Sequence, residues 1–99
     1  MNIPQIQQQL QINRVLLACN HDMLPHLIER RNYLRAQGNE IRAEREHKVV
    51  VATRKVIARY AALQRALKKD YQRALFQEEI ARIVKRGKKA TLAGSVEVI

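Results

Sequence analysis

The segment from Glu40 to Arg86 contains no glycine and no proline. These two residue types form most turns and end most helices, so a long stretch without either favours long helices. The chain of 99 residues has only three glycines and two prolines, which is too few to turn many short strands. Its three tyrosines, one phenylalanine and absence of tryptophan leave the core to Leu, Ile, Val and Ala. The sequence therefore predicts an all-α fold.

Helix boundaries before Glu40 follow from apolar spacing and capping residues. A first helix over 3–19 is predicted by apolar residues at helical intervals, namely Ile3, Ile6, Leu10 and Leu17. A break is predicted at 20–22, because Asn and Asp cap the helix that follows them. Pro25 fits the first turn of a second helix over about 23–37, and Gly38 is typical of a helix end.

Beyond Asn39, which can cap a third helix, the segment 40–86 is either one helix or two. One helix would extend for roughly 68 Å, and a chain this small has little to pack along such a rod. We therefore favour a break near 68–70, with Asp70 as the cap, and a helix end at Gly87. The expected fold is a small helical bundle or helical hairpin of three to four helices with a short extended C-terminal tail. The expected domains are a single helical domain, 1–87, and a basic flexible tail, 88–99.

Charge is distributed unevenly along the chain. The formal net charge is +10, with seven Lys and Arg against five Asp and Glu in residues 1–50 and twelve against four in residues 51–99. A basic half beside a nearly balanced half indicates that one part of the molecule faces a polyanion.

The basic residues of the segment 48–75 gather on one side of a helical wheel. We call this surface the basic arc; its residues are Lys48, Arg54, Lys55, Arg59, Arg65, Lys68, Lys69 and Arg73. The opposite side is apolar and is expected to pack, with Val49, Val56, Ile57, Tyr60, Leu63, Leu67, Tyr71, Ala74 and Leu75. A second basic patch contains Lys85, Arg86, Lys88 and Lys89. No acidic residue occurs between Glu46 and Asp70, so the arc carries unrelieved like-charge repulsion.

Three interpretations of the basic arc remain open. Clustered Lys and Arg on one helix face are typical of nucleic-acid binding, here through backbone contacts that tolerate any sequence, because the arc holds no aromatic residue and no Asn. An acidic protein surface is the alternative partner. The arc could also be a solvated face that acids on other helices neutralise, namely Glu29, Glu40, Glu44 and Glu46. A membrane surface is not expected, because the apolar stripe lacks tryptophan.

No catalytic or metal centre is predicted. Cys19, His21 and His26 do not match the paired spacings of a zinc site. His21 is two residues after Cys19, so on a helix it faces away from the thiol and cannot act as its base. We expect no cofactor and no enzymatic activity. A single cysteine and the lack of a signal-like N-terminus favour a cytoplasmic protein.

The sequence thus predicts a non-enzymatic protein that binds nucleic-acid backbone, as a small subunit or accessory factor of a larger nucleoprotein assembly. Its uncharged N-terminal helix would join it to a second copy or to another subunit. The alternative is a helical adaptor, scaffold or inhibitor of an acidic protein, comparable to secretion stalks or to phage assembly and anti-defence proteins.

Overall fold

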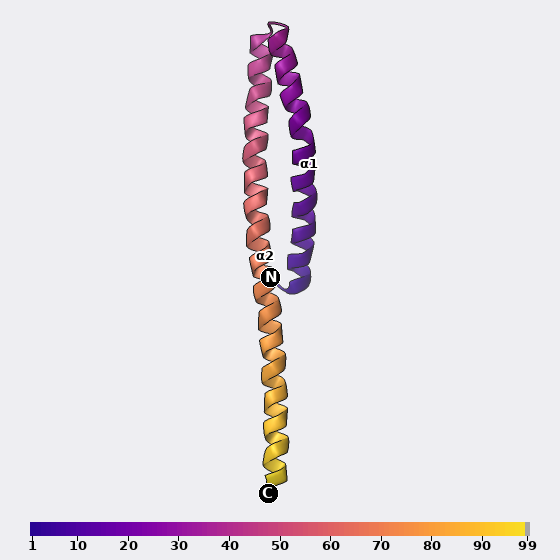
Figure 1. Ribbon diagram of the computed structural model, residues 1–99, viewed down its shortest axis with the longest axis vertical. Coiled ribbons are helices and arrows are strands. Elements are labelled where there is room, and N and C mark those ends of the chain that lie inside the picture. Colours follow the sequence, from indigo (N-terminus) through magenta and orange to yellow (C-terminus); the bar gives the residue numbers. More distant parts are fainter. Residues whose placement is uncertain (99) are drawn as a thin grey trace.

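The computed structural model contains two α-helices joined by a short loop: α1, Ile3–Ala36, and α2, Glu40–Val98. The structure describes residues 1–98, with side chains as far as Lys88. The helices run antiparallel as a hairpin, and α2 extends well beyond the N-terminus of α1 (Figure 1). The molecule is a rod with extents of 92 × 15 × 14 Å. Within the described residues, neither helix has a stretch long and apolar enough to cross a membrane.

The expected three to four helices are wrong, because two predicted breaks lie inside continuous helices. Residues 20–22 belong to α1, where Asn20 Nδ2 donates to the Leu16 carbonyl at 2.8 Å instead of capping a new helix. Asp70 likewise lies within α2 and is exposed. Capping residues fit a helix interior at a cost of a few tenths of a kcal/mol, roughly, which packing against a partner helix outweighs.

The predicted positions of Pro25 and Gly87 are also wrong. Pro25 lies inside α1 rather than in a first turn, and Gly87 lies inside α2 rather than at its end. α1 is bowed (Figure 1), as helices with an interior proline commonly are. The extended C-terminal tail is wrong as well, because α2 continues to Val98. The division into a domain and a flexible tail at residue 87 stays a prediction.

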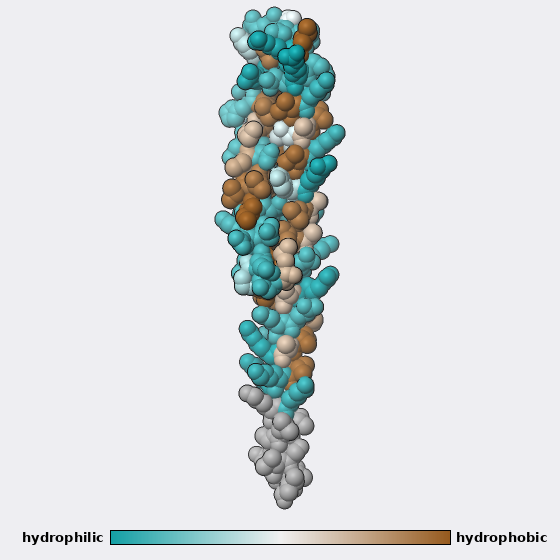
Figure 2. Space-filling model, turned by 180° about the vertical axis from the view of Figure 1, so that it is seen from behind, coloured by the Kyte–Doolittle hydropathy of each residue, from teal (hydrophilic) through white to brown (hydrophobic). Residues whose placement is uncertain are grey.

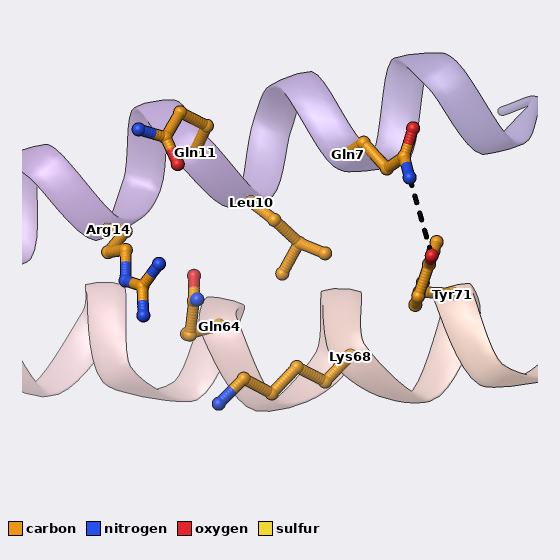
Figure 3. Close-up of a pocket in the computed structure, with 7 residues that line it drawn as sticks. All are labelled: Gln7, Leu10, Gln11, Arg14, Gln64, Lys68 and Tyr71. Carbon is orange, nitrogen blue, oxygen red and sulfur yellow. Dashed lines mark hydrogen bonds between the residues drawn. The ribbon is translucent and has the colours of Figure 1, made fainter.

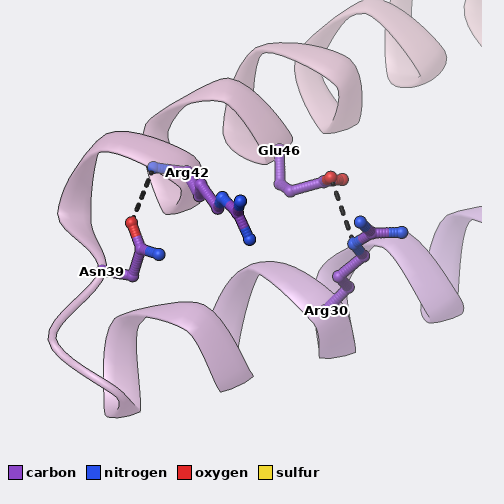
Figure 4. A network of polar contacts seen from close by, with 4 residues as sticks. All are labelled: Arg30, Asn39, Arg42 and Glu46. Atoms are coloured by element: carbon purple, nitrogen blue, oxygen red, sulfur yellow. Dashed lines mark hydrogen bonds and ion pairs between the residues drawn. The ribbon is translucent and has the colours of Figure 1, made fainter.

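The loop between the helices confirms the predicted turn. Gly38 adopts a φ of 75°, a conformation that favours glycine, and the Asn39 backbone N–H donates to the Leu34 carbonyl at 2.9 Å. Asn39 Oδ1 accepts from the Arg42 backbone N–H at 3.3 Å, as expected of a cap for the next helix (Figure 4). At the other end of α1, Asn2 and Gln5 form a reciprocal capping box.

The two helices meet along a seam whose residues alternate at intervals of three and four. The seam of α1 contains Ile3, Ile6, Leu10, Asn13, Leu17, Asn20, Leu24, Leu27, Arg31 and Leu34. The seam of α2 contains Ala43, Glu46, Val50, Thr53, Ile57, Tyr60, Gln64, Leu67, Tyr71 and Ala74. Every one of these side chains is buried or half-buried. This repeat is that of an antiparallel coiled coil.

The hydrophobic core is consequently narrow. Ile6, Ala43, Val50 and Leu67 are the buried apolar side chains among the described residues. Val49 and Leu63, which the sequence placed on the packing side of α2, are each 45% exposed. One partner helix covers only a stripe of α2, so apolar residues beside that stripe stay in contact with solvent.

Candidate nucleic-acid interface

The basic arc forms a continuous ladder on α2. All eight of its side chains are exposed. Because α2 is unbroken, they lie on one rigid helix over about 38 Å from Lys48 to Arg73. This length is close to one turn of duplex nucleic acid, roughly 34–36 Å.

No described carboxylate forms an ion pair with the arc. The ion pairs among the described side chains join Arg30 to Glu46 at 3.2 Å and Arg82 to Glu78 and Glu79 at 4.0 and 3.8 Å. Glu46, one of the acids considered as a neutralising group, thus pairs with α1 beside the loop and not with the arc (Figure 4). The arc therefore presents its positive charge to solvent.

Arg14 of α1 adds a cation that the sequence analysis did not include. It lies with Lys68 along an open groove of about 330 Å³ between the helices, together with Gln7, Leu10, Gln11, Gln64 and Tyr71. Arg14 reaches from α1 toward α2, and Lys68 extends along α2 in the direction of Gln64 (Figure 3). Gln7 Nε2 donates to the Tyr71 hydroxyl at 3.3 Å and closes one end of the groove. Only the pairing of the helices brings Arg14 beside the arc.

The second basic patch does not continue the arc. Lys85, Arg86 and Lys88 are exposed on the part of α2 beyond α1, and Lys89 lies outside the described side chains. Lys85 is twelve residues after Arg73, about 18 Å farther along the helix. By helical rotation it lies on nearly the opposite side of α2 from the centre of the arc. A straight polyanion that lies along the arc would therefore contact only part of the second basic patch.

The residues weighed as a metal or catalytic group lie on the surface of α1. Cys19, His21 and His26 are exposed, and Asp22 between them is exposed too. In the described part of the chain, no three or more His, Cys, Asp or Glu side chains are grouped so that they could hold a metal ion.

An apolar strip on the hairpin is a further feature that the sequence analysis did not separate from the core. We call it the apolar flank; its residues are Ile12, Leu16 and Met23 of α1 and Val49, Val56 and Leu63 of α2. Met23 and Arg30, seven residues apart, share one side of α1, as Arg42 and Val49 do on α2. Arg30 and Arg42 line the same pocket, so these sides of the two helices meet. Apolar side chains interrupt the hydrophilic surface over the hairpin (Figure 2).

Comparisons of the chain with protein-family models, with curated proteins and with solved structures found no match.

Proposed function

We propose that this chain is a non-enzymatic protein that binds the phosphate backbone of nucleic acid through the basic arc of α2, as a small subunit or accessory factor of a larger assembly. The arc supports this function most strongly, because it combines eight exposed cations on one helix with no described ion pair to any of them. Phosphate contacts of this kind release condensed counterions, so binding is strongly salt-dependent.

The mode of binding follows from the residue types on the arc. Lys and Arg contact phosphate, whereas single-strand binding through bases needs exposed aromatic rings. Tyr60 and Tyr71 lie half-buried in the seam, and the exposed rings of Tyr33 and Phe76 lie off the arc. Binding is therefore expected to tolerate any base sequence. The proposed location is the cytoplasm, where an exposed Cys19 stays reduced.

The apolar flank favours a second candidate function, that of an adaptor for a protein partner. Its exposed side chains include Met23, at 53%, and Leu16, at 39%. Apolar strips on a helical surface are common docking sites for other helices. In this alternative the arc would contact an acidic protein surface beside the docked helix.

Charge reversal on the arc tests the proposed function. The arc variant Arg54→Glu/Arg65→Glu/Lys69→Glu should lose binding to generic DNA and RNA while its circular dichroism spectrum stays helical. The matched control is Arg35→Glu/Arg42→Glu/Arg45→Glu, which reverses three exposed arginines near the loop. Both variants change the net charge equally, so only the position of the cations differs.

We expect the control variant to retain most of its affinity, because its substitutions lie off the arc. Equal loss in the two variants would mean that net charge alone attracts nucleic acid, and it would remove the arc as a site. Retained binding in the arc variant would contradict the proposed function directly. Stoichiometric binding to one acidic protein, without affinity for nucleic acid, would instead support the adaptor.

A further inference from the structure

Within residues 1–98, no helix lies beside the part of α2 after Ala74. Ala74 is the last residue of the seam and lines a pocket with Met1 and Ile6, while α2 continues to Val98, beyond the end of α1 (Figure 1). We call residues 75–88 the extension. Isolated helices of this length are marginal in water and gain most of their stability from packing an apolar face. The extension therefore needs a partner that the hairpin does not supply.

The extension carries its own apolar stripe. Phe76, Ile80 and Ile83 are 66%, 44% and 53% exposed, and they follow each other at intervals of four and three. Gly87 comes four residues later and continues the repeat. Phe76 lies two residues after Ala74, which is about 200° of helix rotation. The stripe thus faces away from the side of α2 that α1 covers, and a second helix can pack on it without meeting α1.

Charges on the extension change sign along its length. Glu78 and Glu79 come first, and Lys85, Arg86 and Lys88 follow. All of these side chains are exposed. A parallel pair of identical extensions would place acid beside acid and base beside base. An antiparallel pair places the acidic half of each copy beside the basic half of the other.

We infer that the extension binds the extension of a second copy of this chain, antiparallel and about a two-fold axis. The spacing of the stripe fits one register, in which Ile80 of each copy packs against Ile83 of the other. The same register places the ring of Phe76 over Gly87 of the second copy. Among the described residues, nothing lies within 4 Å of a Cβ built at Gly87, which leaves room there for the ring of Phe76 of the second copy.

The flanking charges agree with this register. In an antiparallel coiled coil, residues that directly precede seam positions face each other along one side of the helix pair. Glu79 directly precedes Ile80, and Arg86 directly precedes Gly87. The register therefore places Glu79 of each copy beside Arg86 of the other. Two-fold symmetry forms this pair twice. In the single chain, the Glu79 carboxylate lies 3.8 Å from the Arg82 guanidinium. Both side chains are more than half exposed, so this contact is weak and Glu79 can leave it for Arg86 of the second copy.

Sedimentation of the nuclease-treated full chain over a wide concentration range tests the pairing. Light scattering with a refractive-index detector gives the mass, since the chain has no tryptophan and absorbs weakly. We expect a concentration-dependent rise from 11.5 kDa to twice that mass. A monomer at every concentration would overturn the inference.

A charge exchange tests the register. Glu79→Arg and Arg86→Glu should each weaken association by about tenfold, because each creates two like-charge contacts. The double variant Glu79→Arg/Arg86→Glu should restore it. A double variant no better than the single ones would exclude the antiparallel arrangement.

An apolar-to-charged substitution tests the stripe itself. Ile80→Asp should abolish the dimer while the hairpin stays helical, since Ile80 makes no seam contact. Ile41→Asp is the matched control, because Ile41 is 73% exposed at the far end of α2. A dimer that survives Ile80→Asp, or that is lost in Ile41→Asp, would contradict the assigned surface.

Discussion

Asn13 Nδ2 donates a hydrogen bond to Gln64 Oε1 at 2.7 Å and joins α1 to α2 in the middle of the seam. The same nitrogen donates to the Tyr60 carbonyl at 2.9 Å. Asn13 is only 3% exposed, and its Oδ1 has no hydrogen-bond partner among the described residues. A polar residue in a coiled-coil seam favours one register and lowers stability. Asn13 therefore holds α1 at one position along α2.

Replacing Asn13 by leucine should stabilise the hairpin and weaken its choice of register. Leucine removes a buried carbonyl oxygen without a partner, and the half-buried Gln64 can turn to water. We expect the free energy of unfolding to rise by about 1 kcal/mol in urea titrations at fixed protein concentration. Gln9→Leu, at an exposed position, is the control and should change it by less than about 0.5 kcal/mol. A less stable Asn13→Leu variant would contradict this account of the seam.

Val50 and Val49 provide a matched pair of adjacent valines. Val50 is fully buried against α1, whereas Val49 is 45% exposed. Val50→Ala should lower the free energy of unfolding by about 1–2 kcal/mol, since lost burial exceeds the gain in helix propensity of about half a kcal/mol. Thermal melts should show a midpoint lower by about 4–8 °C per kcal/mol. Val49→Ala should leave the midpoint nearly unchanged, and equal effects at the two sites would contradict the assigned seam.

The two prolines of α1 differ in cost because of their positions. Pro25 lies in the helix interior and removes one backbone hydrogen bond, whereas Pro4 lies in the first turn, where the missing donor has no helical partner. Pro25→Ala should raise the free energy of unfolding by about 2 kcal/mol, after allowance for the greater freedom of the unfolded chain. Pro4→Ala should change it by less than about 0.5 kcal/mol. Thermal melts of the two variants measure this difference, and no gain in Pro25→Ala would argue against a continuous α1.

The loop and the helical class could be predicted from the sequence, and the number of helices could not. Gly38 and Asn39 act locally, so their signals hold in the structure. The signals at 20–22 and at Asp70 are also local, but the seam continues past both points with an unchanged repeat. Packing along that repeat outweighs a capping preference worth about 1 kcal/mol. A long rod needs a partner to pack against, and α1 is that partner for residues 43–74.

The basic arc could be predicted more fully than the packing face. Helical periodicity alone shows which charged residues share one side of α2, whereas the packing face also depends on where α1 lies. All its described side chains are exposed as expected. The predicted packing face is too wide, because it includes the half-exposed Val49, and it omits Thr53. Thr53 is 8% exposed, and its hydroxyl donates to the Val49 carbonyl at 2.8 Å, which allows a polar residue in the seam. Arg14 joins the arc only through the pairing of helices distant in sequence.

The salt dependence of nucleic-acid binding tests the proposed function most directly. Fluorescence anisotropy of a duplex of about two turns, titrated at several salt concentrations, gives the slope of log K against log salt. If about six of the arc cations engage phosphates, the slope should be about −5, with similar values for unrelated base sequences. Absence of binding at low salt, despite a net charge of +10, would contradict the proposed function and leave the cations to an acidic protein partner.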